Sequence, residues 1–258
     1  MQYPIDVRNL SKNYSNKAAV KNINFKINKN EILGLLGPNG CGKTTTIAMM
    51  LGLLKPTNGI VLIDGENIEK KRIQLLHKMN FISPYIELPK KLTVKENLIV
   101  YGKLYGVKKV LLRIEYLSEE LRLTEFLNKK TGELSSGQKN RVSLAKALIN
   151  DPKILFLDEP TASLDPETGD FVRTFIEKLS KEREMSILLA SHNMNEVKRL
   201  CKNVLMMKDG LLIDRGTPNE LIKKHGKINL EEVFLKLNRT SNESVSYTHL
   251  TLPTKRIV

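Results

Sequence analysis

Residues 32–54, ILGLLGPNGCGKTTTIAMMLGLL, constrain the fold of this 258-residue chain more than any other stretch. The apolar run at residues 32–36 predicts a short strand buried on both faces, and residues 43–54 predict a helix. Between them, residues 37–44 match the pattern G-x-x-x-x-G-K-[ST] in full. A strand, a glycine-rich loop and a helix in this order point backbone N–H groups and the helix dipole at one anion. The stretch therefore predicts a site for nucleotide phosphates.

The residue types of this loop predict separate tasks. Its three glycines let the backbone turn tightly around a phosphate. Lys43 is expected to reach the β- and γ-phosphates, and the hydroxyl of Thr44 is expected to bind the magnesium ion that bridges them. A glycine-rich turn that carries Lys-Thr by chance is the alternative, which the agreement of the whole motif with its context disfavours. The predicted nucleotide-binding residues here are Gly37, Pro38, Asn39, Gly40, Cys41, Gly42, Lys43, Thr44 and Thr45.

Composition narrows the class of protein. Hydrophobic residues make up 41% of the chain, enough for one large domain or two lobes. No apolar run reaches the roughly 18 to 20 residues that cross a bilayer, and the first ten residues lack a signal-peptide core, so we expect a cytosolic or peripheral protein. Cys41 and Cys201 are the only cysteines. They exclude a disulfide framework and a cysteine-based zinc site, and they fit a reducing compartment.

The charge balance favours an anionic partner. Lys and Arg outnumber Asp and Glu by 42 to 28, which gives a net charge of +14. A nucleotide, a nucleic acid and an acidic membrane surface all meet this description. Because the basic residues are scattered without interleaved aromatic side chains, the pattern argues against a nucleic-acid platform. A lysine-rich surface that is merely solvated remains an alternative.

The first third of the chain is predicted to be mostly strands around the phosphate loop. Alternating polarity at residues 4–28 predicts antiparallel strands with one buried face, and Tyr14 is expected in the turn between them. Further strands are predicted at residues 60–63 and 79–82. The second of these leads into Ser-Pro, which begins a connection.

A helical subdomain is predicted to be inserted at about residues 85–150. Residues 93–96, Thr-Val-Lys-Glu, form a capping box, and periodic apolar positions continue to about residue 127. Residues 135–138, Ser-Ser-Gly-Gln, form a second capping box at the start of an amphipathic helix. Such an insertion usually offers a binding surface.

Strands and helices alternate in the rest of the chain, which predicts an α/β fold with a parallel sheet. Strands are predicted at residues 153–157, 186–190, 204–207 and 211–213, and helices at 171–179, 194–200 and after a cap at 217–220.

Residues 238–258 differ in character, being polar and rich in Ser and Thr without a helical period. We expect disorder there. The final stretch SYTHLTLPTKRIV also resembles the translated read-through of a sequencing adapter, so a non-native tail is expected. The N-x-[ST] matches at Asn238 and Asn242 are interpreted as chance.

Three residues at the ends of predicted strands are candidates for metal binding or catalysis. Asp158 closes an apolar strand, at the edge of an α/β sheet where ligands bind, and it can hold magnesium. Glu159, next to it, can polarise an attacking water. His192 occupies the equivalent place after a later strand. The alternatives are a turn with two solvated carboxylates and a histidine that acts only as a structural hydrogen-bond partner.

The motifs and their order resemble the ATPase subunits of ATP-binding cassette (ABC) transporters. GPNGCGKT at 37, LSSGQ at 134, ILFLDEP at 154, SLD at 163 and His192 follow the family's order over residues 5 to about 225. The resemblance implies a P-loop NTPase (RecA-like) core with an antiparallel β subdomain and an inserted α-helical subdomain, with the whole ABC ATPase domain at residues 1–237. Its spacing most resembles bacterial exporters of the ABC-2 type.

The resemblance also implies roles for single residues. In this family two cassettes pair head to tail and sandwich ATP between one phosphate loop and the partner's signature. It thus implies ATP and Mg²⁺ as ligands, and Lys43, Glu159 and His192 as catalytic residues. Thr44 and Asp158 are implied as magnesium ligands, and Tyr14 as an adenine-stacking residue, although an ordinary half-buried tyrosine is the alternative. Ser135, Ser136, Gly137 and Gln138 are implied as contacts to the partner's nucleotide. Asp165, counted with the nucleotide-binding residues, is implied to communicate across the dimer.

Two positions depart from the family pattern. Ser136 stands where glycine is commoner, a small change that leaves room for a phosphate. The family usually has a magnesium-contacting glutamine at the end of the strand before the helical subdomain, and that position falls on Pro84. Ser83 is the candidate substitute through its hydroxyl. The glutamine's role in coupling the site to the transporter is thereby in doubt.

The expected function is ATP hydrolysis that powers transport, with export by analogy, through separate multispanning permease subunits. The second cassette of the expected dimer is either another copy or a paralogue, and the expected location is the cytoplasmic face of the inner membrane. No direct nucleic-acid contact is expected. The alternatives are a soluble ABC-type ATPase acting on nucleic acid or ribosomes, and a regulatory module that holds ATP without turnover.

Overall fold

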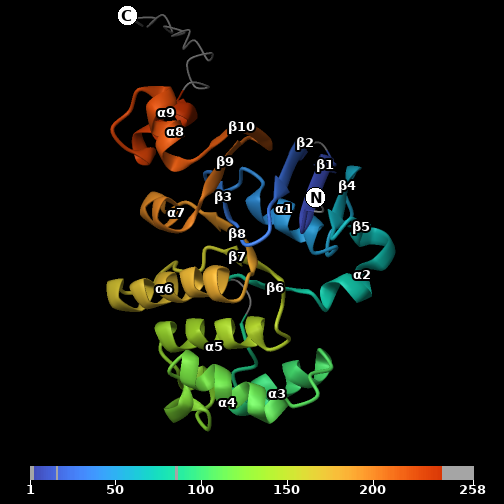
Figure 1. Ribbon diagram of the computed structural model, residues 1–258, viewed down its shortest axis with the longest axis vertical. Helices are drawn as coiled ribbons and strands as arrows, with labels where there is room; N and C mark the ends of the chain where they lie inside the picture. Colours follow the sequence, from blue (N-terminus) through green and yellow to red (C-terminus); the bar gives the residue numbers. More distant parts are fainter. Residues whose placement is uncertain (1–2, 16, 85–86, 240–258) are drawn as a thin grey trace, which may run out of the picture.

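The computed structural model describes residues 3–15, 17–84 and 87–239, and its framework is a six-stranded sheet (Figure 1). Every neighbouring pair of strands is parallel except the pair at one edge. The predicted parallel sheet is therefore confirmed. In spatial order the strands are β10 (Leu211–Gly216), β9 (Asn203–Lys208), β3 (Ile32–Leu36), β8 (Ser186–Ser191), β7 (Ile154–Asp158) and β6 (Met79–Ile82).

A second, antiparallel sheet has four strands. The alternation of apolar and polar residues along its first two strands buries one face and exposes the other, as the sequence predicts. Tyr14 is the last residue of the first strand rather than part of the turn. In spatial order the strands are β2 (Lys17–Ile27), β1 (Ile5–Tyr14), β4 (Asn58–Ile63) and β5 (Glu66–Asn67).

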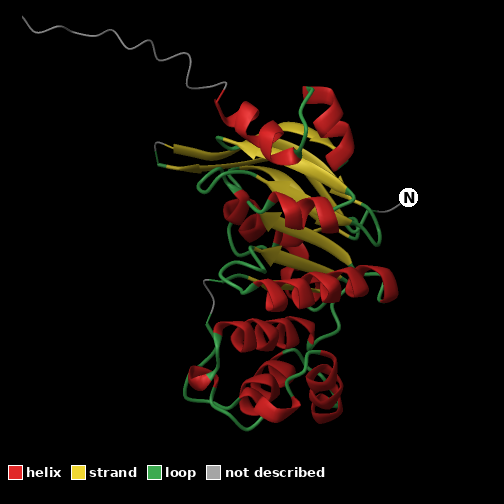
Figure 2. Ribbon diagram, turned by 90° about the vertical axis from the view of Figure 1, so that its left-hand side faces the viewer, coloured by secondary structure: helices red, strands yellow, loops and turns green. Residues whose placement is uncertain are grey.

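The helices divide between the sheets and one end of the molecule. Figure 2 shows the strands gathered in one part and a group of helices in the other. Within the described residues, no helix is long and apolar enough to cross a membrane. The helices are α1 (Lys43–Met50), α2 (Ile68–Leu76), α3 (Val94–Leu104), α4 (Val110–Glu120), α5 (Ser136–Leu148), α6 (Pro166–Glu182), α7 (Met194–Leu200), α8 (Pro218–His225) and α9 (Leu230–Arg239), with 3₁₀ turns at Thr124–Phe126 and Thr131–Glu133.

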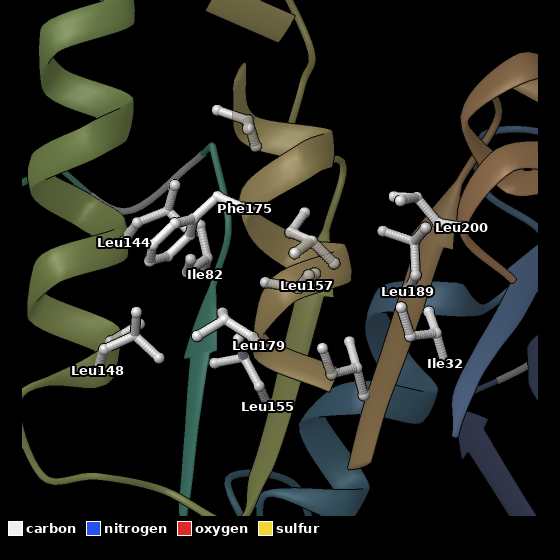
Figure 3. Close-up of a cluster of buried hydrophobic side chains, with 14 of the residues drawn as sticks. Ile32, Ile82, Leu144, Leu148, Leu155, Leu157, Phe175, Leu179, Leu189 and Leu200 are labelled. Carbon is white, nitrogen blue, oxygen red and sulfur yellow. The ribbon is translucent and has the colours of Figure 1, made fainter. Parts of the chain in front are cut away.

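Two hydrophobic clusters hold these layers together. One joins a face of the large sheet to α5, α6 and α7, and continues into α3 and α4; Figure 3 shows Leu144 and Phe175 from two of these helices meeting Ile82 of β6. The other joins the opposite face of that sheet to α1 and the antiparallel sheet. Helix α5 therefore links the α/β core to α3 and α4.

The predicted capping boxes are present and begin three helices. The Thr93 side chain accepts from the Glu96 N–H at the start of α3, and the Glu96 carboxylate accepts in return from the Thr93 N–H. Ser135 with Gln138 does the same for α5, as does a Thr-Glu pair for α8. These reciprocal bonds satisfy N–H groups that a helix otherwise leaves without partners, which is why the motif can be read from sequence.

Two predicted boundaries are wrong. Helix α1 ends at Met50, not at residue 54, because Gly52 adopts a left-handed conformation and its N–H donates to the Met49 carbonyl, which closes the helix. Helix α9 was not predicted, and it runs to Arg239. The predicted start of the tail at residue 238 therefore falls inside a helix. Residues 240–258 lie outside the described residues.

Lys146 ties α5 to the strand that ends at Ile82. Its side chain is buried, its Nζ lies 3.3 Å from the Phe81 carbonyl oxygen, and the Phe81 and Tyr101 rings lie 5.3 and 5.6 Å from the ammonium. The two ring faces attract the cation, but burial removes its water. Burial lowers the pKa of Lys146 to about 8.

We predict that Lys146→Met removes an alkaline rise in stability. The unfolded chain keeps this proton up to the ordinary lysine pKa of 10.5, whereas the folded chain releases it above about 8. The free energy of unfolding should therefore rise with pH in that window, by at most about 1.4 kcal/mol per pH unit. Urea unfolding of the wild type at several pH values, compared with Lys146→Met and with the exposed-site control Lys139→Met, measures it. Parallel wild-type and Lys146→Met curves would contradict this.

Candidate functional site

The phosphate loop connects the end of β3 to the start of α1, as predicted. Lys43 folds back over the loop, and its Nζ donates to the carbonyl oxygens of Gly37 at 2.7 Å and Pro38 at 3.2 Å. The lysine side chain is buried. The Lys43 ammonium is thus held against the carbonyl oxygens of the loop, at the start of α1.

Two glycines of the loop are required by its surroundings. Gly42 has a φ of +114°, and a Cβ there would lie 2.5 Å from the Ala19 carbonyl oxygen. A Cβ on Gly37 would collide with the Met207 carbonyl. Gly42 is also the N-cap of α1, and no side chain caps that end. The first N–H groups of the helix are therefore left for an anion.

Thr44, the second residue of α1, meets Asp158, the last residue of β7. The Thr44 hydroxyl donates to Asp158 Oδ2 at 2.8 Å, and Asp158 is buried. Burial raises the pKa of the Asp158 carboxyl, and the hydrogen bond from Thr44 opposes that shift. A buried carboxylate beside a hydroxyl offers two hard oxygen donors to a cation. This set suits Mg²⁺, which is commonly held by one or two protein oxygens and the phosphates of its nucleotide.

Glu159 and His192 form a second pair beside the first. The Glu159 carboxylate lies 2.7 Å from His192 Nδ1, and its backbone N–H donates to the Ala190 carbonyl at 2.8 Å. Glu159 has a φ of +51°, a rare conformation for a residue with a side chain. Its side chain is 12% exposed against 56% for His192. The hydrogen bond from the Glu159 N–H to β8 thus holds Glu159 in a strained turn, with its carboxylate against His192.

A buried carboxylate that the sequence analysis missed braces both loops. Glu196 of α7 accepts from the Thr161 hydroxyl and from the Ser191 hydroxyl, each at 2.7 Å. It therefore connects the segment after Glu159 to the segment that carries His192. Burial raises the pKa of the Glu196 carboxyl. In the sequence, Glu196 stands three residues after the N-cap Asn193, where a glutamate ordinarily belongs to a capping box. That spacing gives no sign of its bonds to Thr161 and Ser191.

The signature residues lie apart from the phosphate loop of their own chain. Among the described residues no hydrogen bond joins Ser135, Ser136, Gly137 or Gln138 to residues 37–45. A Cβ on Gly137 would lie 3.0 Å from Thr168, so the start of α5 packs closely against α6.

Asp165 lies at this contact as the N-cap of α6. Its carboxylate accepts from the Thr168 N–H at 2.9 Å, and that hydrogen bond lowers the pKa of Asp165. The sequence analysis also missed Asn140, whose Nδ2 donates to the Pro160 carbonyl at 2.7 Å. Asn140 thus joins the signature helix to the loop after Glu159.

The remaining predicted residues lie at the margins. Tyr14 is 48% exposed, with Lys12 Nζ 5.3 Å from its ring centroid. Ser83 and Pro84 follow β6 and line a cavity of about 290 Å³ that Ser136 and Glu159 also line. The position where glutamine is usual therefore shares a cavity with Glu159 and the start of the signature helix.

The ABC transporter family profile matches residues 20–162, more than half of the chain. The chain belongs to the ABC transporter family. The predicted ABC ATPase identity and P-loop fold are confirmed, ATP is the nucleotide it binds, and its reaction is ATP hydrolysis.

The similarity extends well beyond that segment. The chain is 36% identical over 233 residues to the Nod factor export ATP-binding protein I of Burkholderia orbicola (strain AU 1054), covering 90% of this chain and 76% of the relative. A solved ATP-binding subunit of an ABC transporter superimposes with a TM-score of 0.83 at 26% identity, covering 91% of this chain and 99% of that one. A dimeric ATP-binding cassette in a post-hydrolysis state, bound to ADP and Pi, gives 0.76 at 27% identity, covering 83% and 98%.

For this ABC ATPase we predict that Glu196→Ala slows turnover without weakening ATP binding. The substitution removes the link between the segment after Glu159 and the segment that carries His192. If these residues act in hydrolysis, their misplacement should lower kcat by about tenfold to a hundredfold. Among the described residues, no hydrogen bond joins Glu196 to residues 37–45, so the dissociation constant for a fluorescent ATP analogue should stay within about twofold. Phosphate release and nucleotide titration separate the two effects.

Glu196→Gln is the matched control for that experiment. Its amide keeps the size of the buried side chain and can bond to both hydroxyls, so its kcat should stay within about threefold of the wild type. Equal kcat values for the alanine variant and the wild type would contradict the bracing role.

Proposed function

We propose that this ABC ATPase powers export through separate membrane-spanning permease subunits, at the cytoplasmic face of the cell membrane. The observation that carries the proposal is the convergence of Lys43, Thr44, Asp158, Glu159 and His192 at the ends of three neighbouring strands. The 36% identity to a Nod factor export ATP-binding protein favours export over import.

We assign the phosphate contact to Lys43 and the metal contacts to Thr44 and Asp158. Lys43 Nζ would leave the loop carbonyls for the β- and γ-phosphates, a short movement for a flexible side chain. Thr44 and Asp158 would hold Mg²⁺. When bound, this ion neutralises charge on the phosphate oxygens. The other nucleotide contacts would come from the loop residues Gly37, Pro38, Asn39, Gly40, Cys41, Gly42 and Thr45.

Glu159 is the proposed general base. Its nearly buried carboxylate can accept a proton from the attacking water, and hydrogen bonding to His192 orients it. With Nδ1 of His192 engaged by the glutamate, Nε2 remains for the γ-phosphate or the attacking water. The hydrogen bond to β8 keeps the base in place, because it holds Glu159 in its left-handed turn.

The second half of the site is proposed to come from a partner cassette, either another copy or a paralogue. Ser135, Ser136, Gly137 and Gln138 begin α5, whose N-terminal dipole can stabilise a phosphate. Asp165 would couple the two cassettes at that contact, since both Asp165 and Gly137 lie against Thr168. The similar dimeric cassette supports this arrangement.

Two further residues, Tyr14 and Ser83, are proposed to contact the nucleotide and its metal ion. Tyr14 would stack on adenine, because its ring is half exposed at the end of a hairpin whose next strand packs against Gly42. Ser83 would replace the usual glutamine as a metal contact, because it lines the same cavity as Glu159.

We predict that Glu159→Gln lowers ATP turnover by at least about a hundredfold, because the amide cannot accept the proton. ATP binding should persist, so the variant should accumulate as an ATP-bound dimer. Phosphate release measures turnover, and size-exclusion chromatography with light scattering measures the mass with and without ATP. Glu125→Gln, at an exposed site, is the matched control. Wild-type turnover in Glu159→Gln would remove the base assignment.

Co-purification tests the transporter role itself. From detergent-solubilised membranes of the native cell, the tagged protein should carry a multispanning membrane protein in a stoichiometric complex. Isolation with ribosomes or nucleic acid, and without any membrane protein, would favour the soluble ABC-type ATPase instead. Mass spectrometry of the purified complex distinguishes the two.

A further inference from the structure

The hairpin formed by the end of α3 and the start of α4 exposes three leucine side chains. Leu104 is 72% exposed, Leu111 57% and Leu112 60%. Single exposed leucines are ordinary, but three within nine residues at one hairpin indicate a surface that contacts something apolar. We call residues 103–112 the hairpin tip.

The hairpin tip is also strongly basic. Its sequence, KLYGVKKVLL, contains Lys103, Lys108 and Lys109 and no acidic residue, and all three lysines are exposed. In the described part of the chain, no ion pair involves any of the three. Their charges therefore face solvent beside the exposed leucines.

The hairpin tip is folded before any partner arrives. Gly102 of α3 touches Val110 of α4 so closely that a Cβ on the glycine would collide with the valine. The Val107 N–H donates to the Gly102 carbonyl at 2.9 Å, and the Gly106 N–H donates to the Lys103 carbonyl at 3.0 Å. A surface ordered in advance loses little conformational entropy on binding.

Its place in the molecule leaves this surface open. Helices α3 and α4 lie at one end of the long axis, and α8 and α9 lie toward the other (Figure 1). None of the residues of the candidate site belongs to the hairpin tip. Binding there is compatible with an intact nucleotide site.

We propose that the hairpin tip binds the surface of an anionic lipid bilayer. Lysines beside exposed leucines match a headgroup region in which negative charge lies above an apolar layer: the ammonium groups would pair with the phosphates while the leucines enter the boundary. A purely apolar protein groove would leave the three charges without partners. This inference does not depend on the export function, because the purified protein and protein-free vesicles suffice to test it.

Flotation with vesicles tests the proposal. The wild type should float with vesicles of phosphatidylcholine containing about one third phosphatidylglycerol, and much less with pure phosphatidylcholine. Replacing Lys103, Lys108 and Lys109 together by Gln should lower the partition coefficient by about a hundredfold, since each lysine near an anionic surface contributes about fivefold. Raising the salt should weaken wild-type binding by screening the charges.

A second variant isolates the apolar contribution. Replacing Leu104, Leu111 and Leu112 together by Gln should lower partitioning at least about tenfold and leave the salt dependence of the remaining binding intact. The control changes Lys223 of α8 and Ile228, which lies between α8 and α9, to Gln. Both are exposed, and α8 and α9 lie toward the opposite end of the molecule (Figure 1). The control should bind as the wild type does. Thermal unfolding and ATP turnover verify that every variant is folded.

Three results would overturn the proposal. The wild type could fail to float with the anionic vesicles. The control could lose as much binding as the hairpin variants, which would mean that charge spread over the whole protein is responsible. Finally, the hairpin variants could keep full vesicle binding while losing a co-purifying membrane protein, in which case the leucines serve a protein partner instead of lipid.

Discussion

The hydrogen bond between Thr44 and Asp158 is the contact on which the site depends, because it joins residues 114 positions apart in the sequence. It forms only if β3 and β7 flank β8 in one parallel sheet, so that their carboxyl ends meet. Once Asp158 is buried at that edge, its charge favours a cation beside it. The neighbouring turn then presents Glu159 to His192, so the phosphate, metal and base candidates of this chain lie together at the carboxyl ends of β3, β8 and β7.

Helix α5 connects this centre to the rest of the molecule. Its first turn carries the signature residues, Asn140 bonds the loop after Glu159, and Lys146 holds the strand that leads to Ser83. One helix therefore contacts three regions of the candidate site. Helices α3 and α4 pack against the same helix, so the hairpin tip is connected to α5 by a continuous cluster of packed side chains.

Much of this architecture could be predicted because its signals are local. The apolar runs of β3, β7 and β8 and the reciprocal bonds of the capping boxes depend on neighbouring residues, and the glycine pattern of the phosphate loop follows from backbone sterics. The errors have two origins. Glu196 was overlooked because its partners, Thr161 and Ser191, lie on other segments. Helix α9 and the end of α1 were missed although their signals are local: Asn229 caps the first turn of α9, and Gly52 ends α1.

The sequence alone determined the chemistry available to this protein: a phosphate loop with Lys43 and Thr44, a carboxylate pair, a histidine and a signature motif in the order of an ABC ATPase. Only the tertiary structure decided which of these groups meet. Thr44 contacts Asp158 and Glu159 contacts His192, whereas the signature residues stay apart from the phosphate loop. The reason is that motifs encode local backbone geometry, while side-chain partners are set by how the strands order within a sheet and how helices pack on it.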